Sequence, residues 1–379
     1  MSEAPRPGAP VPADELTALA GYVLDAPAPV TGADGLEHLA YELVLQNPYS
    51  LLVTVERVEI VDNRGQVNRT IEGDAIPELL TVFGTGPGAT FGAGQGGVMI
   101  LDATADRPRR VPSSLVHRIE VSLEVSPGVP FDNSAGVLAT TFETGPTAVL
   151  NDNPVVISPP LRGEHWWDGI GCCAVRNPHR GAVLAVNGAF HATERYAIDW
   201  VQLDGEGRLF VGPIDQLSSY AYYGAPIHAV ADGRVVNLLD GLPDQTPGAL
   251  PTGITGAEAG GNYIVQDIGG GNYAFYAHMQ PNSLRFEIGD MVREGEVIGL
   301  LGNSGNTDGP HLHFHVMDGL APLSSKGVPY EFTRFIGEGV VTNLDQVVVG
   351  APAAIDTSTL SGRFRRVLPL DQQVVTFPE

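Results

Sequence analysis

The chain has 379 residues, enough for two or three domains, and its content of 43% hydrophobic and 17% charged residues is ordinary for a globular protein. Its formal net charge of −23 repels phosphate backbones, so we expect no nucleic-acid partner. No apolar run reaches the roughly 18 residues that span a bilayer, and residues 1–12 lack the basic and apolar regions of a secretory signal, so neither a membrane span nor a signal peptide is expected in this chain.

The N-terminal part of the chain predicts strands. Gly and Pro make up about a fifth of the sequence, and helix-period patterns are scarce. Residues 1–35 predict an extended lead-in. Residues 36–150 predict an immunoglobulin-like β-sandwich, because apolar and polar residues alternate in several turn-bounded stretches. These stretches are Tyr41–Leu45, Leu52–Val61, Gly97–Asp102 and His117–Val125. They hold no catalytic constellation, which favours a folded spacer over a ligand-binding module.

Residues 151–180 contain several Pro residues and predict a linker between two domains. Its Trp166 and Trp167 are expected to pack at a domain interface, and stacking on a glycan is the alternative. Cys172 and Cys173 are adjacent, and a disulfide between neighbours is strained and rare, so we expect a buried or free pair. At the other end of the chain, residues 341–379 predict a tail that returns to a sheet as a hairpin.

Residues 181–340 predict a second β-rich domain, organised around Gly309–His315. Side chains two apart on a strand share a face, so His311 and His313 should project to one side and Leu312 and Phe314 into a core. Two imidazoles held on one strand face are typical of a metal site.

Asp199 is the expected partner of these histidines. Ile198 and Trp200 flank it, and a carboxylate among apolar neighbours is costly to bury unless it is paired or binds a metal. With His191 and one histidine of the later strand, Asp199 completes three zinc ligands and leaves a fourth position for water, as in catalytic zinc sites. Strand alternation also places Tyr276 and His278 on one face, where a lone histidine is more often a bystander.

These motifs resemble those of the lysostaphin/LytM-type zinc metalloendopeptidases. The family pattern has a His before an Asp, a Tyr-Ala-His, and a Gly-Pro-His-Leu-His-Phe. Residues 224–235, 261–265, 288–292 and 295–299 also match in the family's order. The resemblance implies that His191, Asp199 and His313 bind Zn2+, that His311 is the general base, and that His278 is a second catalytic histidine.

The chain departs from the family pattern at two positions. Seven residues separate His191 from Asp199 where the family often has three, and the nearby substitute is His179, in a predicted loop after Pro178. At position 315 the family usually has an acidic or amide residue. His315 could orient a ligand or line the groove, and lining is favoured.

The strand patterns predict a mainly β protein with an N-terminal immunoglobulin-like β-sandwich, and the resemblance implies a C-terminal antiparallel-sheet LytM-like metallopeptidase domain. The resemblance also implies an extracellular or cell-envelope enzyme that cleaves peptide bonds of bacterial peptidoglycan, with peptidoglycan peptide as its partner. Tyr276, Ser304 and Thr307 are expected to contact substrate, and Tyr276 to stabilise the oxyanion. The alternatives are a catalytically silent LytM-like regulator and a wall- or glycan-binding protein.

Overall fold

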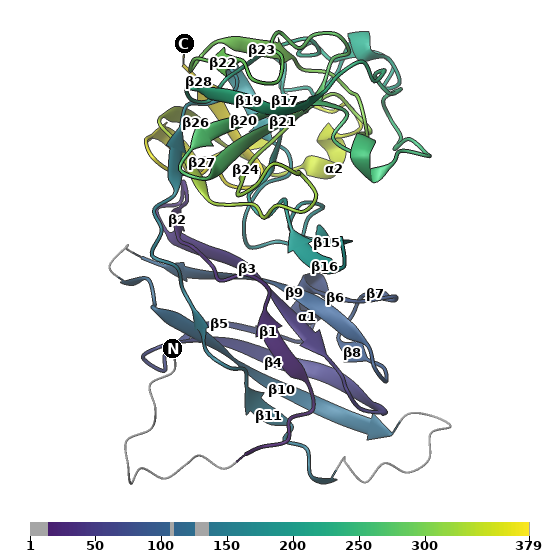
Figure 1. The fold of residues 1–379 in the computed structure, drawn as a ribbon, viewed down its shortest axis with the longest axis vertical. Helices are drawn as coiled ribbons and strands as arrows, with labels where there is room; N and C mark the ends of the chain where they lie inside the picture. Colours follow the sequence, from purple (N-terminus) through teal and green to yellow (C-terminus); the bar gives the residue numbers. More distant parts are fainter. Residues whose placement is uncertain (1–13, 107–109, 126–135, 379) are drawn as a thin grey trace. The chain divides into compact units, whose positions relative to one another are not determined.

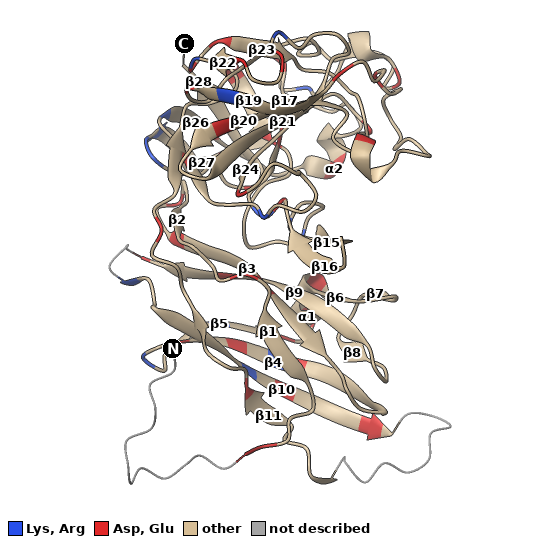
Figure 2. Cartoon of the chain, in the orientation of Figure 1, with Lys and Arg blue, Asp and Glu red and all other residues tan. Residues whose placement is uncertain are grey.

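The computed structural model describes residues 14–106, 110–125 and 136–378. The described chain is mainly β (Figure 1), which confirms the expected fold class at this level. Among the described residues, no helix is long and apolar enough to cross a membrane. The acidic residues are spread over both parts of the chain (Figure 2), so its negative charge is not confined to one segment.

The chain forms two compact units. Unit 1 takes its described residues from Met1–Val23, Leu43–Met99 and Ser114–Thr147. Unit 2 comprises Leu24–Glu42, Ile100–Ser113 and Ala148–Glu379. Strands β3 and β9 each contribute residues to both units, so the first part of β3 and the second part of β9 belong with the C-terminal region.

The N-terminal strands form two sheets. One has the order β1-β3-β9-β6-β7, with β2 paired to β3, and the other has the order β11-β10-β4-β5, with β8 and β12 at its edges. Buried and exposed residues alternate along β4 and β10, as expected for strands with one apolar face. The four stretches predicted as strands all lie in strands, and the immunoglobulin-like topology stays a prediction. The bounds are β1 (Ala20–Val23), β2 (Val30–Thr31), β3 (Glu37–Gln46), β4 (Leu51–Asp62), β5 (Val67–Glu72), α1 (Ala75–Leu79), β6 (Leu80–Val82), β7 (Gly86–Pro87), β8 (Thr90–Phe91), β9 (Gly96–Ala105), β10 (Ser114–Val125), β11 (Thr141–Glu143) and β12 (Thr147–Ala148).

A ten-stranded sheet is the frame of unit 2. Its order is β22-β19-β20-β21-β24-β17-β14-β28-β26-β27, and its neighbouring strands are antiparallel. The strands are β14 (Gly163–Asp168), β17 (Ile198–Gln202), β19 (Gly233–Leu239), β20 (Asn262–Gly269), β21 (Asn272–Met279), β22 (Met291–Val292), β24 (Leu312–Met317), β26 (Phe335–Val341), β27 (Ile355–Phe364) and β28 (Gln373–Phe377).

Shorter elements complete unit 2. Strand β13 (Val155–Ile157) pairs in parallel with β25 (Tyr330–Phe332). Two antiparallel pairs are β15 (Val183–Val186) with β16 (Ala189–Ala192), and β18 (Pro226–His228) with β23 (Val297–Leu300). Helix α2 spans Leu344–Val347, and single 3-10 turns lie at Leu217–Ser219 and Gly256–Glu258.

Two segments expected outside the domains are part of this sheet. Strand β14 lies in the predicted linker, and its Trp166 and Trp167 are almost fully buried in separate apolar clusters. The two rings are therefore covered by protein and not available to stack on a glycan. The tail also returns to the sheet, but not as a hairpin, because β27 and β28 both pair with β26 and not with each other.

Strand β24 separates the core of unit 2 from the candidate site. Leu312 and Phe314 lie in the largest apolar cluster, together with Trp200 of β17. His313 and His315 alternate with them and face the other side of the sheet, as the sequence predicted for His313.

Candidate metal centre

Three side chains from separate segments converge on one point of the sheet. Asp199 on β17 lies opposite His313 on β24 in the strand register, and His179 reaches the same place from the loop after β14. The Asp199 Oδ1 atom is 3.2 Å from His179 Nε2 and 3.0 Å from His313 Nδ1. One ligand atom from each of the three residues lies within 4.8 Å of the others, so the group can hold a metal ion.

The second nitrogen of each imidazole is occupied by a neighbour. His179 Nδ1 is 3.1 Å from the carbonyl oxygens of Ile170 and of Ala197, so Nδ1 carries a proton, and Nε2 is the nitrogen that would bind a metal in the neutral ring. His313 Nε2 lies 2.9 Å from His315 Nδ1, an arrangement that frees His313 Nδ1 for a metal. This donor set, two oriented imidazoles and one carboxylate, suits zinc.

His315 both contacts a candidate ligand and lines a cavity. Its Nδ1 orients His313, which was the less favoured of its two expected roles. The side chain also lines the cavity beside the site, and its buried Nε2 has no hydrogen-bond partner among the described residues.

The charges at the site favour a cation. Burial alone would keep the Asp199 carboxyl neutral, but His179 and His311 hold the pKa of Asp199 well below its usual range. Burial likewise opposes a charge on His179, yet the Asp199 carboxylate raises the pKa of His179 to about 9. The site thus keeps its carboxylate ionised and stabilises positive charge beside it.

His191 does not join this group. It lies on β16, opposite Leu184 of β15, in a hairpin whose turn is Asn187-Gly188 with positive φ at both residues. Asn-Gly is the strongest short hairpin signal, and the hairpin pairs His191 with β15 and not with the strand that carries Asp199. The structure therefore brings His179, the substitute considered in the sequence, to the place expected for His191.

Two further histidines lie beside the three candidate ligands. His311 Nε2 is 3.4 Å from Asp199 Oδ1, and the rings of His278 and His311 are 4.5 Å apart. His311 Nδ1 lies 2.8 Å from the Gly309 carbonyl oxygen, and His278 Nδ1 lies 2.7 Å from that of Ser304. A carbonyl only accepts, so Nδ1 of each ring carries a proton, and Nε2 is the nitrogen that holds the lone pair whenever the ring is neutral. Burial, with help from His311 and His313, holds the pKa of His278 well below its usual value, so this ring is neutral.

A β-bulge explains how His278 reaches the site. In the pairing of β20 with β21, Ile264 faces Tyr276 and Asn262 faces Met279, so Ala277 and His278 together oppose one residue. His278 has φ 60°, a left-handed conformation that is uncommon outside glycine. The extra residue reverses the alternation and turns His278 away from the face that Tyr276 occupies.

The expectation that Tyr276 faces the active site is therefore wrong. Its side chain is fully buried on the core side of the sheet, where its ring packs on Phe314. The hydroxyl donates to Gln266 Oε1 at 2.7 Å and accepts the Val230 N–H at 2.9 Å. It has no free position from which to stabilise an oxyanion.

The turn 303–307 borders the site, but its hydroxyls do not reach into it. Ser304 Oγ donates to the Met279 carbonyl and accepts the Asn262 N–H. Thr307 Oγ1 lies 2.7 Å from the Gly309 carbonyl oxygen and 2.9 Å from Asn303 Oδ1, so its single proton is donated to one of these two local acceptors. Both hydroxyls are buried, so the turn supports His278 and His311 and does not offer these groups to a substrate.

A cavity of about 390 Å³ lies along the same face of the sheet. His278, His313 and His315 line one side of it, and Glu194 and Asn306 contribute polar groups. Most of the remaining wall is small or apolar, including Gly256, Ala257, Ala259, Gly260, Ala277, Ala321, Pro322 and Leu323. A peptide of small residues could lie beside the candidate metal site.

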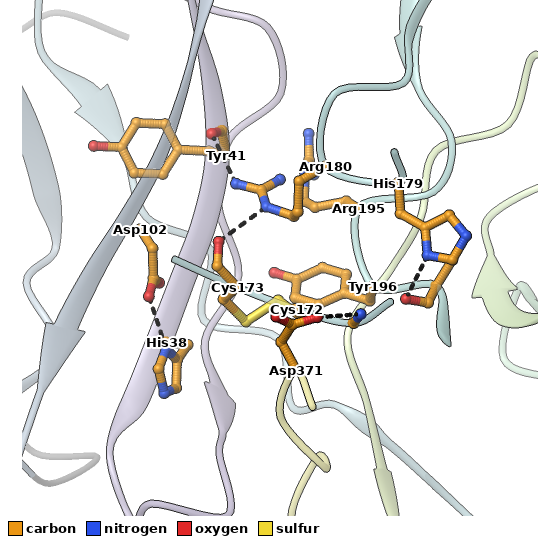
Figure 3. The surroundings of a disulfide bond; sticks show 12 residues. His38, Tyr41, Asp102, Cys172, Cys173, His179, Arg180, Arg195, Tyr196 and Asp371 are labelled. Atoms are coloured by element: carbon orange, nitrogen blue, oxygen red, sulfur yellow. Dashed lines mark hydrogen bonds and ion pairs between the residues drawn. A yellow bond between two sulfur atoms is a disulfide. The ribbon is translucent and has the colours of Figure 1, made fainter. Parts of the chain in front are cut away.

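The loop that carries His179 is held by several contacts (Figure 3). Cys172 and Cys173 form a disulfide and are buried, so the pair is buried as expected but its thiols are not free. The Cys172 carbonyl accepts the Asp371 N–H, and the Cys173 carbonyl accepts Arg180 Nε. These bonds restrain the chain on both sides of the disulfide.

The model of peptidase family M23 matches residues 217–325 of this chain. That range contains the Tyr-Ala-His and Gly-Pro-His-Leu-His-Phe motifs. Residues 217–325 are a lysostaphin-like M23 peptidase domain. His179 and Asp199 precede the matched range. The pairing of β17 with β24 brings Asp199 to its histidines, and the loop after β14 brings His179 there.

Two curated relatives match parts of the chain that carries this M23 domain. Endolysin 2638A of Staphylococcus phage 2638A is 34% identical over 83 residues, which are 21% of this chain and 17% of that protein. The glycyl-glycine endopeptidase ALE-1 of Staphylococcus capitis is 26% identical over 116 residues, which are 31% of this chain and 28% of that protein. The chain thus spans less than a third of the length of either relative.

Among solved structures, the catalytic domain of lysostaphin from Staphylococcus simulans is similar at 21% identity, over 43% of this chain and 88% of that one, with a TM-score of 0.24.

Proposed function

We propose that this chain is a zinc-dependent endopeptidase that cleaves peptide bonds of bacterial peptidoglycan at the cell envelope or outside the cell. One observation carries the proposal: His179, Asp199 and His313 converge beside a cavity, next to two histidines whose Nδ1 atoms are held by backbone carbonyls. The M23 domain supports a peptidase reaction, and the similarity to a glycyl-glycine endopeptidase supports a peptide substrate.

In this proposal, His179 Nε2, Asp199 Oδ1 and His313 Nδ1 hold the zinc ion. Bound there, zinc would polarise the scissile carbonyl and make water a nucleophile near neutral pH. Three protein ligands leave room for water and substrate, as a catalytic site requires.

The neighbouring histidines supply the proton transfers. His311 is the proposed general base, because its Nε2 atom lies nearest to the ligand group and its Nδ1 proton is held by the Gly309 carbonyl. The proposed role of His278 is to hydrogen-bond the reacting groups through Nε2. Its neutral state suits this role, since a charged imidazolium would repel the cation.

Zinc content tests this function most directly, and the chain offers a matched pair of variants. His179→Ala should purify with little zinc and show no hydrolysis of peptidoglycan fragments, whereas His191→Ala should keep both near the level of the unaltered protein. Elemental analysis and a fragment-release assay measure the two quantities. Zinc loss in His191→Ala with retention in His179→Ala would contradict the ligand set.

The two alternative functions have less support. A silent regulator need not keep all five groups, yet His179, Asp199, His278, His311 and His313 lie together in this chain. A glycan-binding protein that used Trp166 and Trp167 would need exposed rings, and both are buried. Hydrolysis that is abolished by a chelator and restored by zinc would exclude both alternatives.

A further inference from the structure

A buried carboxylate binds two arginines close to the candidate metal site. Glu42 on β3 is completely buried, and Arg180 and Arg195 are almost so. Arg180 Nη1 donates to Glu42 Oε1 at 2.6 Å. Arg195 Nε lies 3.1 and 3.0 Å from the two carboxylate oxygens, and Arg195 Nη2 also donates to Oε2. One carboxylate thus joins two segments that are distant in the sequence from it.

The first arginine is adjacent to a candidate metal ligand. Arg180 follows His179 in the chain, and its backbone N–H donates to Asn177 Oδ1. Besides binding Glu42, its guanidinium donates to the Cys173 carbonyl at 3.1 Å (Figure 3) and to the Leu101 carbonyl at 2.9 Å. A guanidinium with this many fixed acceptors holds the backbone beside His179 in one position.

The second arginine restrains the same imidazole from its other side. Arg195 lies in a turn closed by the hydrogen bond from the Ala197 N–H to the Glu194 carbonyl. The carbonyl of Ala197 accepts the Nδ1 proton of His179, and Asp199 follows two residues later. Through Arg195, Glu42 therefore fixes both the acceptor that orients His179 and the start of the strand that carries Asp199.

The cost of this arrangement indicates a role beyond stability. Burying ion pairs requires desolvation, and well-packed apolar side chains often stabilise a core as well or better. The paired hydrogen bonds between a guanidinium and a carboxylate provide a fixed geometry instead, because each bond has a required direction. That geometry is applied here to the two segments that carry His179 and Asp199.

We propose that Glu42 is a positioning residue for the metal site, acting through Arg180 and Arg195 on His179 and Asp199. This proposal rests on the zinc site proposed above. Groups that orient metal ligands typically contribute roughly 10- to 100-fold to metal affinity. Loosening this cluster should therefore weaken zinc binding by that order while the fold is kept.

The test uses variants of the full chain that keep the positive charge beside Glu42 and remove the paired hydrogen bonds of the guanidinium group. Arg195→Lys and Arg180→Lys each retain a cation beside Glu42 but cannot reproduce its hydrogen bonds. Arg118→Lys is the matched control, because Arg118 donates to Glu59 Oε2 at 2.9 Å and to Glu143 Oε1 at 2.9 Å in unit 1, which holds none of the candidate ligands. The zinc dissociation constant is measured by competition with a chromophoric chelator, and the absorption spectrum of bound Co2+ reports the ligand geometry.

We expect each lysine variant to bind zinc at least about tenfold more weakly and to alter the Co2+ spectrum, and the control to change neither. Combining Glu42→Gln with Arg195→Lys should weaken binding by less than the product of the two single effects, because both act through one contact.

Each other outcome is decisive. Unaltered protein that bound no zinc would overturn both the proposed function and this inference. Zinc binding by the lysine variants with unchanged affinity and Co2+ spectrum would overturn the positioning role and leave the zinc site standing. If the single variants fail to fold, the apolar triple variant Glu42→Leu, Arg180→Met and Arg195→Met removes the cluster without stranding a charge. A folded triple variant with full zinc affinity would also overturn the proposal.

Discussion

His311 and His313 are identical side chains two residues apart, but their hydrogen bonds differ. His311 Nδ1 is held by the Gly309 carbonyl, whereas His313 Nδ1 faces Asp199 and its Nε2 contacts His315. These contacts support the proposed roles of His313 as a metal ligand and of His311 as the general base.

Substitution should separate these roles. His313→Ala should lose zinc and activity together. His311→Ala should keep zinc near full occupancy while hydrolysis slows by about a hundredfold or more, because only proton transfer is removed. Elemental analysis and turnover on peptidoglycan fragments measure the two effects. If His311→Ala lost zinc as fully as His313→Ala, the site would have four protein ligands, and the peptidase proposal would fail.

Two buried histidines away from the site should give opposite pH dependence of stability. Burial lowers the pKa of His117 to about 4, below the unfolded value of about 6.5. The unfolded chain takes up the proton first, so this histidine's contribution is complete above pH 6.5 and is lost as the pH falls toward 4, by about 3 kcal/mol in total. For His38, burial opposes the charge, but hydrogen bonds with Asp102 and Asp34 raise its pKa to about 10. Its contribution is complete below pH 6.5 and is lost as the pH rises toward 10.

Denaturant unfolding of His117→Gln and His38→Gln across this pH range tests both signs. The stability difference between the unaltered protein and His117→Gln should shrink as the pH falls from 6.5 to 4. For His38→Gln it should shrink as the pH rises from 6.5 to 10. A difference that does not vary with pH would show that the histidine concerned is not shifted as described.

Sequence reasoning identified most of the candidate site residues and missed one for a local reason. Short sequence motifs and strand patterns predicted Asp199, His278, His311 and His313. His191 was preferred to His179 because the family pattern has a His shortly before the Asp, and because His179 follows Pro178 in a predicted loop. Distance in sequence is a poor guide there, since the Asn187-Gly188 turn folds His191 into a hairpin, and His179 reaches Asp199 across the loop after β14.

At the scale of strands, β21 shows why strict alternation failed for Tyr276. One additional residue at Ala277–His278 reverses the facing of everything beyond it, and a sequence pattern with period two contains no marker for that bulge. The same insertion brings His278 to the site and leaves Tyr276 in the core.

Tyr276→Phe should therefore affect stability and not catalysis. Removing the hydroxyl leaves Gln266 Oε1 and the Val230 N–H buried without this partner, a cost of about 1–3 kcal/mol for each group. Thermal unfolding should shift downward, while kcat/KM on peptidoglycan fragments should change little. Tyr273→Phe, at a half-buried position of the same strand, is the control for stability. A large loss of turnover with unchanged stability would restore Tyr276 to the active site.

For the whole molecule, composition and turn signals predicted a mainly β chain, but they did not predict which strands are neighbours. Pairings such as β14 with β28 depend on contacts between distant segments, for which a single sequence has no local signal. The paired Trp residues and the C-terminal strands were accordingly placed outside the sheet to which they belong.

The interior position of β28 makes the C-terminal segment sensitive to substitution. Val375 is fully buried in the main core of unit 2, whereas Thr359 lies exposed on the edge strand β27. Val375→Asp should unfold unit 2 or prevent soluble expression, since it buries an unpaired charge. Thr359→Asp should change stability by no more than about 0.5 kcal/mol. Circular dichroism melting curves compare the two, and equal effects would contradict the strand order.

That strand order also determines when the sheet of unit 2 can form during protein synthesis. Residues 171 and 371, which join the ends of β14 and β28, are 200 positions apart. A ribosome adds about 5–20 residues per second, so β14 is translated roughly 10–40 s before the strand that covers its edge. During that interval β14, next to the strand that carries Asp199, has an unpaired edge. Native assembly of this sheet must therefore follow translation of β28, and the proposed peptidase site gains its final support only at that late stage.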